Sequence, residues 1–560
     1  MRKLLLLASL CCALGVLAAE KPLTVSTTID FLDYVFYDMP KGSSVYPLEH
    51  YEKRIAEMAA GGIDRIYLRV NVCGLTLYPS KVCTRYGDRG RFHDKQQYPG
   101  QVDNLIQTLN AYDPLRETIR LGKKYNLEVW AWENLWDDAA TVVTASGKVD
   151  PTTGKSIDFP LIDPFFEDFP QGYAMRRVLP ADEIAAARNR TIGALEIVSD
   201  QPRNFPARVT AEKLRILTSE NNRAYTPYAE PFVLKTEKLP DGRWKLTVSG
   251  LKIKAPYIKL AFVSPQPKDE KYVFVFAAPG LDQCRIFDTA GARIPAEMGY
   301  CLENRKEAEN SALLFNTIGN WAWDHQNRQL GFALGGSDDG KYLLGFAEFA
   351  VPKTMRHKVA RFEELTKYNF DGFMFNLRSH SPAGSNYGFN PELRELYLKR
   401  YGKDILKDSF DRKKLNELRA DAIDEFLSNC KKLTGGRPLY FSAISNERPT
   451  TNTATAAWNY GVPFHYAKWF AESSVDGVVM INGDFRAEIQ KAAAGKPISI
   501  GVFREMAFGP KGYNFESDLM AIGADHGIAE VELYETLVLN KTPAKFETIK
   551  KAKALRTDKP

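Results

Sequence analysis

Carboxylates follow several short apolar runs in this sequence. Glu505 comes after "PISIGVF" and Arg504, and Glu447 lies in "SNERPT", just after "PLYFSAI". Two carboxyl groups that face one bond can divide acid and base work between them. One, protonated, helps an oxygen to leave, while the other, ionised, attacks or activates water. This is the chemistry of glycosidic bond cleavage, so we predict Glu505 as nucleophile or base and Glu447 as general acid.

Other polar and aromatic side chains at the ends of apolar runs are expected to contact a substrate. Arginine and histidine can hydrogen-bond sugar hydroxyls and keep a nearby carboxylate ionised, and aromatic rings can stack on a sugar. These candidates are Arg69, Trp132, Glu133, Asn376, Arg378, His380, Asp484, Arg504, Tyr534 and Glu535. Asp30, Asp33 and Asp137 also follow apolar runs.

Four of the candidate carboxylates and His380 also have a structural interpretation that the sequence leaves open. Glu447 can cap a loop, and Glu133 can support the floor of a site without touching a substrate. Asp484 and Glu535 can form salt bridges or cap helices. His380 can be a hydrogen-bonded structural histidine.

Other chemistries find little support in the sequence. It contains neither a G-x-S-x-G elbow nor an H-E-x-x-H metal motif, and its 7 histidines are scattered without ligand spacing. We therefore expect no metal and no cofactor. The net charge of +6 is small and dispersed, which argues against a nucleic-acid partner. The expected partner is a carbohydrate substrate, including anionic ones.

The elements that must position these residues alternate between strand and helix. Apolar runs begin at Thr24, Ile63, Leu127, Phe370, Pro438, Val475, Pro497 and Ile528, and amphipathic helical patterns lie between them. Eight such strands predict an α/β fold, a (β/α)8 TIM barrel whose strand ends carry the site. A doubly wound sheet is the alternative, although no glycine-rich phosphate loop follows an early strand.

The strand-helix alternation stops after the third strand. Turn-separated strands follow, such as "PFVLKTEKLPDGRWKLTVSGLKI" with a hairpin turn at residues 241–242, and predict an inserted all-β, sandwich-like domain. The predicted division is a signal peptide at 1–19, a first barrel part at 20–171, the β-rich insertion at 172–340 and a second barrel part at 341–560.

The N-terminal segment predicts export. "MRK" and "LLLLASLCCALGVLA" form a charged start, a short apolar core and a small-residue exit, which is typical of a cleaved signal peptide. We expect a secreted or periplasmic protein with no membrane insertion after cleavage. An oxidising compartment would permit disulfides between Cys73 and Cys83 and between Cys284 and Cys301, with isolated buried thiols as the alternative.

Two long stretches of the sequence resemble a known family. "YDPLRETIRLGKKYNLEVWAWENLWDD" and "FDGFMFNLRSHSPAGSNYGFNPELRELYLKRYGKDI" are similar to bacterial secreted glycosyl-hydrolase-like barrel proteins of the family-10 type. The resemblance covers most of the predicted barrel but not the β-rich insertion. It implies a TIM barrel that acts on poly- or oligosaccharide.

The fourth strand departs from the pattern of such enzymes. Many carry an acid/base glutamate there, commonly after asparagine, but this strand continues from Asn376 into Leu-Arg-Ser-His. Glu505 matches the strand-seven nucleophile, and the Asn446-Glu447 pair comes one strand late. Three readings stay open: a differently assembled pair, a strand count that slips by one, or a barrel that binds carbohydrate without cleaving it. An exported structural or adhesion protein is a further alternative.

Overall fold

The computed structural model describes 15 segments of the chain, and the account below concerns these alone. They are residues 22–88, 99–140, 161–199, 210–212, 214–240, 242–262, 284–301, 312–313, 315, 329–337, 341–377, 387–447, 461–481, 483–506 and 514–557. The expected signal peptide lies outside them. No helix in these segments is long and apolar enough to cross a membrane.

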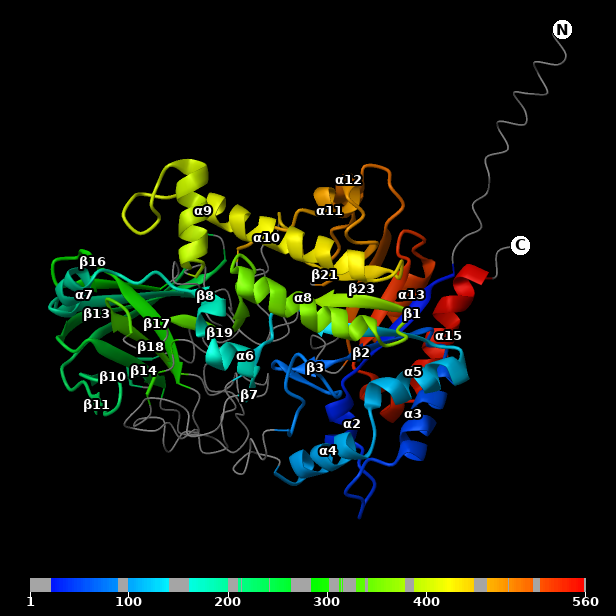
Figure 1. Cartoon of the computed structure of the whole chain (residues 1–560). Coiled ribbons are helices and arrows are strands. Elements are labelled where there is room, and N and C mark those ends of the chain that lie inside the picture. The colour runs from blue at the N-terminus through cyan, green and yellow to red at the C-terminus, as the bar shows by residue number, and fades with distance from the viewer. Residues whose placement is uncertain are drawn as a thin grey trace, which may run out of the picture.

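Eight parallel strands close into a barrel (Figure 1). In order around the barrel they are β1 (Thr24–Ile29), β2 (Arg65–Arg69), β5 (Glu128–Asn134), β20 (Gly372–Asn376), β21 (Leu439–Ala443), β22 (Gly477–Met480), β23 (Ser499–Glu505) and β24 (Glu530–Tyr534). Each predicted strand start lies within two residues of the observed one. The TIM-barrel prediction is confirmed, and the closed barrel excludes a doubly wound sheet.

Helices surround the barrel, and local capping explains where several of them begin. They include α3 (Leu48–Ala60), α4 (Pro99–Ala111), α5 (Pro114–Tyr125), α8 (Pro352–Thr366), α9 (Pro391–Tyr401), α10 (Arg412–Leu433), α11 (Tyr466–Ala471), α12 (Arg486–Ala493), α13 (Phe515–Ala524), α14 (Thr536–Lys541) and α15 (Ala544–Thr557). The Asp113 carboxylate accepts hydrogen bonds from two backbone N–H groups at the start of α5, and Asn126 ends that helix in the left-handed conformation.

The first strand ends before its apolar pattern does. That pattern continues through Phe36, but residues Phe31–Tyr37 form helix α2. Its N-cap is Asp30, whose Oδ1 accepts a hydrogen bond from the Leu32 backbone N–H at 3.2 Å. This cap turns the chain at the end of β1 and places Asp33 in the first turn of α2.

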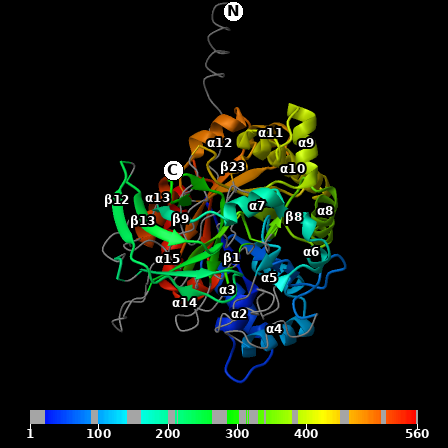
Figure 2. The same cartoon turned by 90° about the vertical axis from the view of Figure 1, so that its left-hand side faces the viewer.

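An all-β insertion lies between β5 and β20. One of its sheets has the order β11 (Thr226–Pro227), β10 (Leu214–Ser219), β14 (Tyr257–Phe262), β18 (Gln329–Leu334), β17 (Ala296–Cys301); the other has β12 (Val233–Lys238), β13 (Trp244–Ile253), β9 (Ile192–Ser199), β15 (Cys284–Asp288), β16 (Arg293–Ile294). Both sheets are antiparallel, and side chains from both form one apolar core, including Leu195, Leu246 and Ile258. The predicted insertion after the third strand is confirmed, as is the β12–β13 hairpin. Figure 2 looks onto this side of the molecule.

Short elements connect the insertion to the barrel. They are β6 (Ala139–Ala140), β7 (Leu161–Ile162), α6 (Pro164–Asp168), the 3-10 helix η1 (Pro170–Gly172), β8 (Tyr173–Met175), α7 (Ala181–Arg188) and β19 (Tyr342–Ala347). Two other short strands, β3 (Asn71–Val72) and β4 (Leu75–Thr76), follow β2 and pair with each other. The returning β19 pairs antiparallel with the outgoing β8, so the two ends of the insertion meet beside the barrel.

Four cysteines of the described segments, Cys73, Cys83, Cys284 and Cys430, are free thiols. Cys73 and Cys83 do not form the disulfide considered from their spacing, and Cys284 is also free. Cys73 Sγ lies 3.9 Å from an oxygen of Asp137, and Cys83 Sγ lies 3.7 Å from an oxygen of Asp163. Free thiols are therefore the correct alternative for these positions, buried at Cys73 and Cys284 and half-buried at Cys83.

Candidate active site at the barrel mouth

Contacts between non-adjacent strands show which side chains fill the barrel lumen. Tyr67 on β2 donates a hydrogen bond at 2.7 Å to Glu530 on β24, although β1 separates the two strands. Arg65 also pairs with Glu530, and its guanidinium lies 5.5 Å from the ring centre of Tyr440 on β21. These side chains must point inward. Because strand residues alternate between faces, Arg69 and Tyr534 also face the lumen, nearer the carboxyl ends.

A chain of hydrogen bonds crosses the mouth of the barrel from β21 to β1. The Ser442 hydroxyl donates to Asn376 at 3.0 Å, and the Asn376 amide donates to Asn134 at 2.8 Å. Asn134 and Arg69 both donate to Asp137 Oδ2, at 2.9 and 2.8 Å. Apart from Ser442, which precedes the end of β21, these residues lie at or just beyond strand ends. They form a shared polar floor.

Arg69 occupies the centre of this floor. It is 5% exposed, donates to Asp30 Oδ2 at 2.5 Å as well as to Asp137, and donates to the Asn71 carbonyl at 3.0 Å. Its guanidinium carbon lies 5.8 Å from the Trp132 ring centre. Because these contacts engage Arg69 on three sides, it holds the two aspartates in place more than it offers free donors to a substrate.

Asp33 and Glu535 form a carboxyl pair beside this floor. A side-chain hydrogen bond joins them, and the pKa of Asp33 is raised well above its usual value. Burial is the largest cause, followed by the charges of Glu535 and Asp30, while Arg69 acts in the opposite direction. Asp33 therefore keeps its proton to a higher pH than an ordinary aspartate does, as a general acid requires.

Three of the predicted residues lie on the lumen side close to this pair. Glu505 at the end of β23 is in register with Tyr534 at the end of β24, the residue before Glu535. Trp132 is in register with Arg69 and is 3% exposed, and its indole N–H has no hydrogen-bond partner among the described residues. A buried indole N–H normally finds a partner, so Trp132 has a donor left for a bound molecule.

Two predicted substrate contacts turn away from the lumen. Glu133 accepts a hydrogen bond at 2.6 Å from Arg361 on α8, and Arg504 donates at 2.6 Å to Asp518 on α13. Each follows or precedes a lumen-facing residue, so the strand alternation points it toward the surrounding helices. The expectation that Glu133 and Arg504 line the site is corrected by this placement.

Glu447 and Asp484 lie on the rim, in a hollow between the ends of β21 and β22. Glu447 is exposed, and the side chain of Asp484 is 54% exposed and pairs with Arg486. Glu488 contributes a third carboxylate to this hollow and is bonded to the Ser445 hydroxyl at 2.7 Å. Arg378 and His380 lie outside the described residues.

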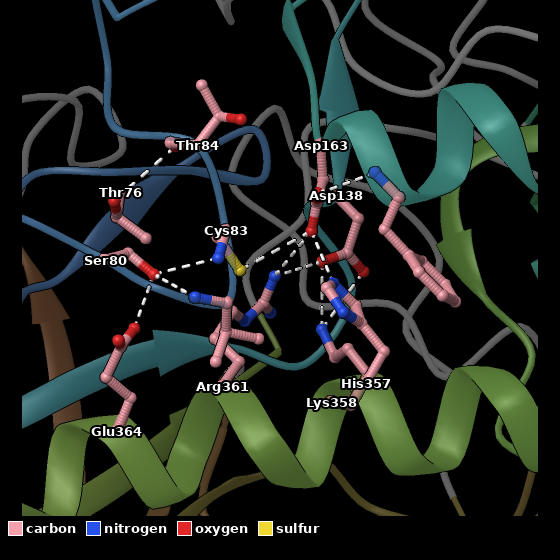
Figure 3. A network of polar contacts seen from close by, with 12 residues as sticks. Thr76, Ser80, Cys83, Thr84, Asp138, Asp163, His357, Lys358, Arg361 and Glu364 are labelled. Atoms are coloured by element: carbon pink, nitrogen blue, oxygen red, sulfur yellow. Dashed lines mark hydrogen bonds and ion pairs between the residues drawn. The ribbon is translucent and has the colours of Figure 1, made fainter.

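The outward-facing Glu133 belongs to a second polar network, between β5 and α8. Figure 3 shows Asp138, Lys358 and Arg361 of this network. Arg361 donates to Glu133 and, at 2.7 Å, to Asp138, while Lys358 lies 3.0 Å from both Asp138 oxygens. All four residues are at most 2% exposed. Burial acts to raise the pKa of Asp138, but Lys358 and Arg361 lower it overall, so this carboxylate is ionised.

Sequence reasoning did not select Asp33, although it noted its place after the first apolar run. The partner Glu535 is 502 residues further along the chain, and no local pattern indicates the contact. Asp30 and Asp137 were noted in the same way, and their shared partner Arg69 could be inferred only as one of several strand-end arginines.

Fold and strand-end geometry define this chain as a TIM-barrel protein with a carboxylate-bearing mouth. No protein-family model and no curated protein matches the sequence. Among solved structures, the catalytic domain of beta-amylase from Paenibacillus polymyxa is 8% identical, with 97% of this chain and 100% of that chain covered and a TM-score of 0.38. The rhamnosidase from Novosphingobium sp. PP1Y is 10% identical, covering 93% and 55%, with a TM-score of 0.30. Such distant similarity carries no argument about activity, and the family-10-type resemblance stays a prediction.

Proposed function

We propose that this protein is a glycoside hydrolase that uses the carboxyl groups at its barrel mouth. The observation that carries the proposal is the hydrogen-bonded pair of Asp33 and Glu535, in which burial and neighbouring negative charge raise the pKa of Asp33. Such a pair supplies a protonated carboxyl group at a place where barrel enzymes bind their substrates.

In the proposed reaction, Asp33 gives its proton to the glycosidic oxygen as the bond from that oxygen to the sugar carbon breaks. Glu505 is the second carboxylate, acting as a base that takes a proton from the attacking water or as a nucleophile. Glu535 positions Asp33 and accepts its hydrogen bond. Trp132 and Tyr534 provide an N–H donor and an aromatic face for the sugar.

The test is to incubate the protein with a panel of neutral, uronate-bearing and sulfated glycans. Hydrolysis is measured as the release of reducing ends. We expect Asp33→Asn and Glu505→Gln to lose about 10²- to 10⁴-fold in kcat, the usual contribution of a general acid or base. Glu447→Gln tests the sequence-based acid on the rim, and Glu472→Gln, an exposed residue after α11, is the control.

The pH profile adds a sharper criterion. Because Asp33 must be protonated, wild-type activity should fall as pH rises through its elevated pKa, and Asp33→Asn should lack that alkaline limb. If Glu447→Gln abolishes turnover while Asp33→Asn and Glu505→Gln retain it, the rim residue is the acid and the mouth assignment is wrong.

A non-catalytic carbohydrate-binding role is the second candidate. The ion pairs of Glu133 with Arg361 and of Asp484 with Arg486 favour this role, because they engage two of the carboxylates that the sequence predicted as substrate contacts. Binding of a glycan without release of reducing ends by the wild-type protein would establish this role in place of catalysis.

Export is part of the proposal. The N-terminal segment supports cleavage near residue 19, with release to the periplasm or the medium. Mass spectrometry of the mature N-terminus from the expressing cell would test this, and an intact Met1 on the accumulated protein would contradict it.

A further inference from the structure

Three potential metal ligands meet beside the buried network of Figure 3. Cys83, Asp163 and His357 each offer one ligand atom within 4.8 Å of the other two. Cys83 Sγ lies 3.7 Å from Asp163 Oδ2, and His357 Nε2 lies 2.6 Å from the same oxygen. One thiol, one carboxylate and one imidazole form a donor set suited to zinc. We propose that these three residues bind one divalent cation of the zinc class.

Each proposed ligand is held in place by partners of its own. Asp163 Oδ1 accepts the Phe165 backbone N–H at 3.0 Å, which leaves Oδ2 directed at the cluster. The His357 ring stacks on the Phe165 ring with centres 3.9 Å apart and planes 6° apart. Such supporting contacts orient metal ligands before the ion arrives.

The loop that carries Cys83 is fixed to the same helix as His357. The Cys83 backbone N–H donates to the Ser80 hydroxyl at 2.8 Å, and Ser80 in turn bonds to Glu364 on α8. The Lys81 N–H donates to Glu364 as well, at 2.6 Å. The thiol is therefore held above one face of α8, where Figure 3 shows it directed toward Asp163.

The distances between the proposed ligand atoms fit a tetrahedrally coordinated ion after a small movement of the side chains. Ligand atoms around such a zinc ion, bound at about 2.0 to 2.3 Å, lie roughly 3.3 to 3.8 Å apart. The sulfur–oxygen distance of 3.7 Å is already in this range. The carboxylate and imidazole, now joined by a hydrogen bond, would separate by about 0.8 Å to reach it.

Charge balance also favours a cation here. Lys358 and Arg361 pair with Asp138 and Glu133, and Arg361 also lies 4.0 Å from Asp163, so three carboxyl groups share two cations. A divalent ion bound to the Cys83 thiolate adds one net positive charge and neutralises this buried group. Cysteine binds a metal ion as the thiolate, so metal binding should release the Cys83 proton to solvent.

The three ligands connect segments that the chain separates. Cys83 follows β4, Asp163 precedes α6 on the path toward the insertion, and His357 lies on α8 after the path returns. An ion at this point would tie the outgoing and returning segments to the barrel, so its main effect would be on stability. A fourth coordination position remains for water.

The test is a titration of the chelator-treated, full-length protein with Co²⁺, which replaces Zn²⁺ and reports its ligands by absorption. We expect one Co²⁺ per chain, a thiolate-to-cobalt band, loss of both signals when Zn²⁺ is added, and a Zn²⁺-dependent rise in Tm. Cys83→Ser should lose the thiolate band, and His357→Asn should weaken binding at least 10-fold. Cys284→Ser, which changes a buried free thiol in the insertion, should behave like the wild type.

Two outcomes would overturn the proposal. One is a wild-type protein that binds no Co²⁺ and gains no Tm from Zn²⁺. The other is a Cys83→Ser variant that folds, as shown by an unchanged circular dichroism spectrum, and keeps the thiolate band. If either ligand variant fails to fold, the wild-type stoichiometry and the Asp163→Asn variant still decide the question.

Discussion

Removing Arg361 should destabilise the barrel strongly. Its side chain is 1% exposed and pairs with both Glu133 and Asp138. Arg361→Met keeps much of the volume but leaves Glu133 as a buried carboxylate without its cation, while Asp138 retains Lys358. Breaking a buried pair in this way costs about 3 to 5 kcal/mol.

A double-mutant cycle separates the charge effect from lost packing. We expect Glu133→Gln alone to cost less, since a glutamine oxygen can still accept from Arg361. In Arg361→Met/Glu133→Gln the stranded charge is gone, so the double variant should be more stable than the sum of the single effects predicts, by at least about 1 kcal/mol.

The assay is denaturant unfolding followed by tryptophan fluorescence. Arg120→Met is the control, because Arg120 is 48% exposed and pairs with Glu117 on the surface of α5, where a pair contributes at most about 1 kcal/mol. An Arg361→Met variant within about 1 kcal/mol of the wild type, or strictly additive single effects, would refute the reasoning about this buried pair.

Three further predictions concern pH and packing. The raised pKa of Asp33 means that its stabilising contribution is present at low pH and is lost as pH rises. The Tm of Asp33→Asn should therefore increase relative to that of the wild type as pH rises above the ordinary aspartate pKa of about 3.9, and a constant difference would contradict this. Hydrogen bonds to two carboxylates raise the pKa of His465 to about 9. His465→Gln should therefore lower the free energy of unfolding by about 1 to 3 kcal/mol below pH 6.5. The difference in stability between this variant and the wild type should shrink as pH rises through 9. Gly372→Ala would place a methyl group 2.5 Å from the Trp130 indole. It should lower the free energy of unfolding by about 1 to 3 kcal/mol in the same denaturant assay. An unchanged free energy of unfolding would contradict tight packing at this position.

Local signals were sufficient for the framework of the fold. Runs of apolar residues, helical periodicity and caps such as Asp113 depend on neighbours within a few positions, so they can be read directly from the chain. The insertion was recognisable for the same reason, because hairpin turns and alternating strands replace the strand-helix alternation. The end of the first strand could not be read in this way, because its apolar pattern continues into α2 and only the Asp30 cap marks the change.

The tertiary structure decided whether each side chain at a strand end points into the barrel lumen or toward the helices. Barrel strands are buried on both faces, toward the lumen and toward the helices, so an apolar run does not reveal which parity points inward. Arg69 and Trp132 proved to face the lumen, whereas Glu133 and Arg504 face the helices.

The sequence by itself therefore determined the eight strands, their order of appearance and the edge of the barrel where polar residues gather. Only the tertiary structure decided which of those residues meet. Asp33 contacts Glu535, and Cys83 joins Asp163 and His357, because barrel closure and the returning α8 bring distant segments together. Contacts of this kind depend on the long-range path of the chain, which leaves no periodic or spacing signal in the residues that make them.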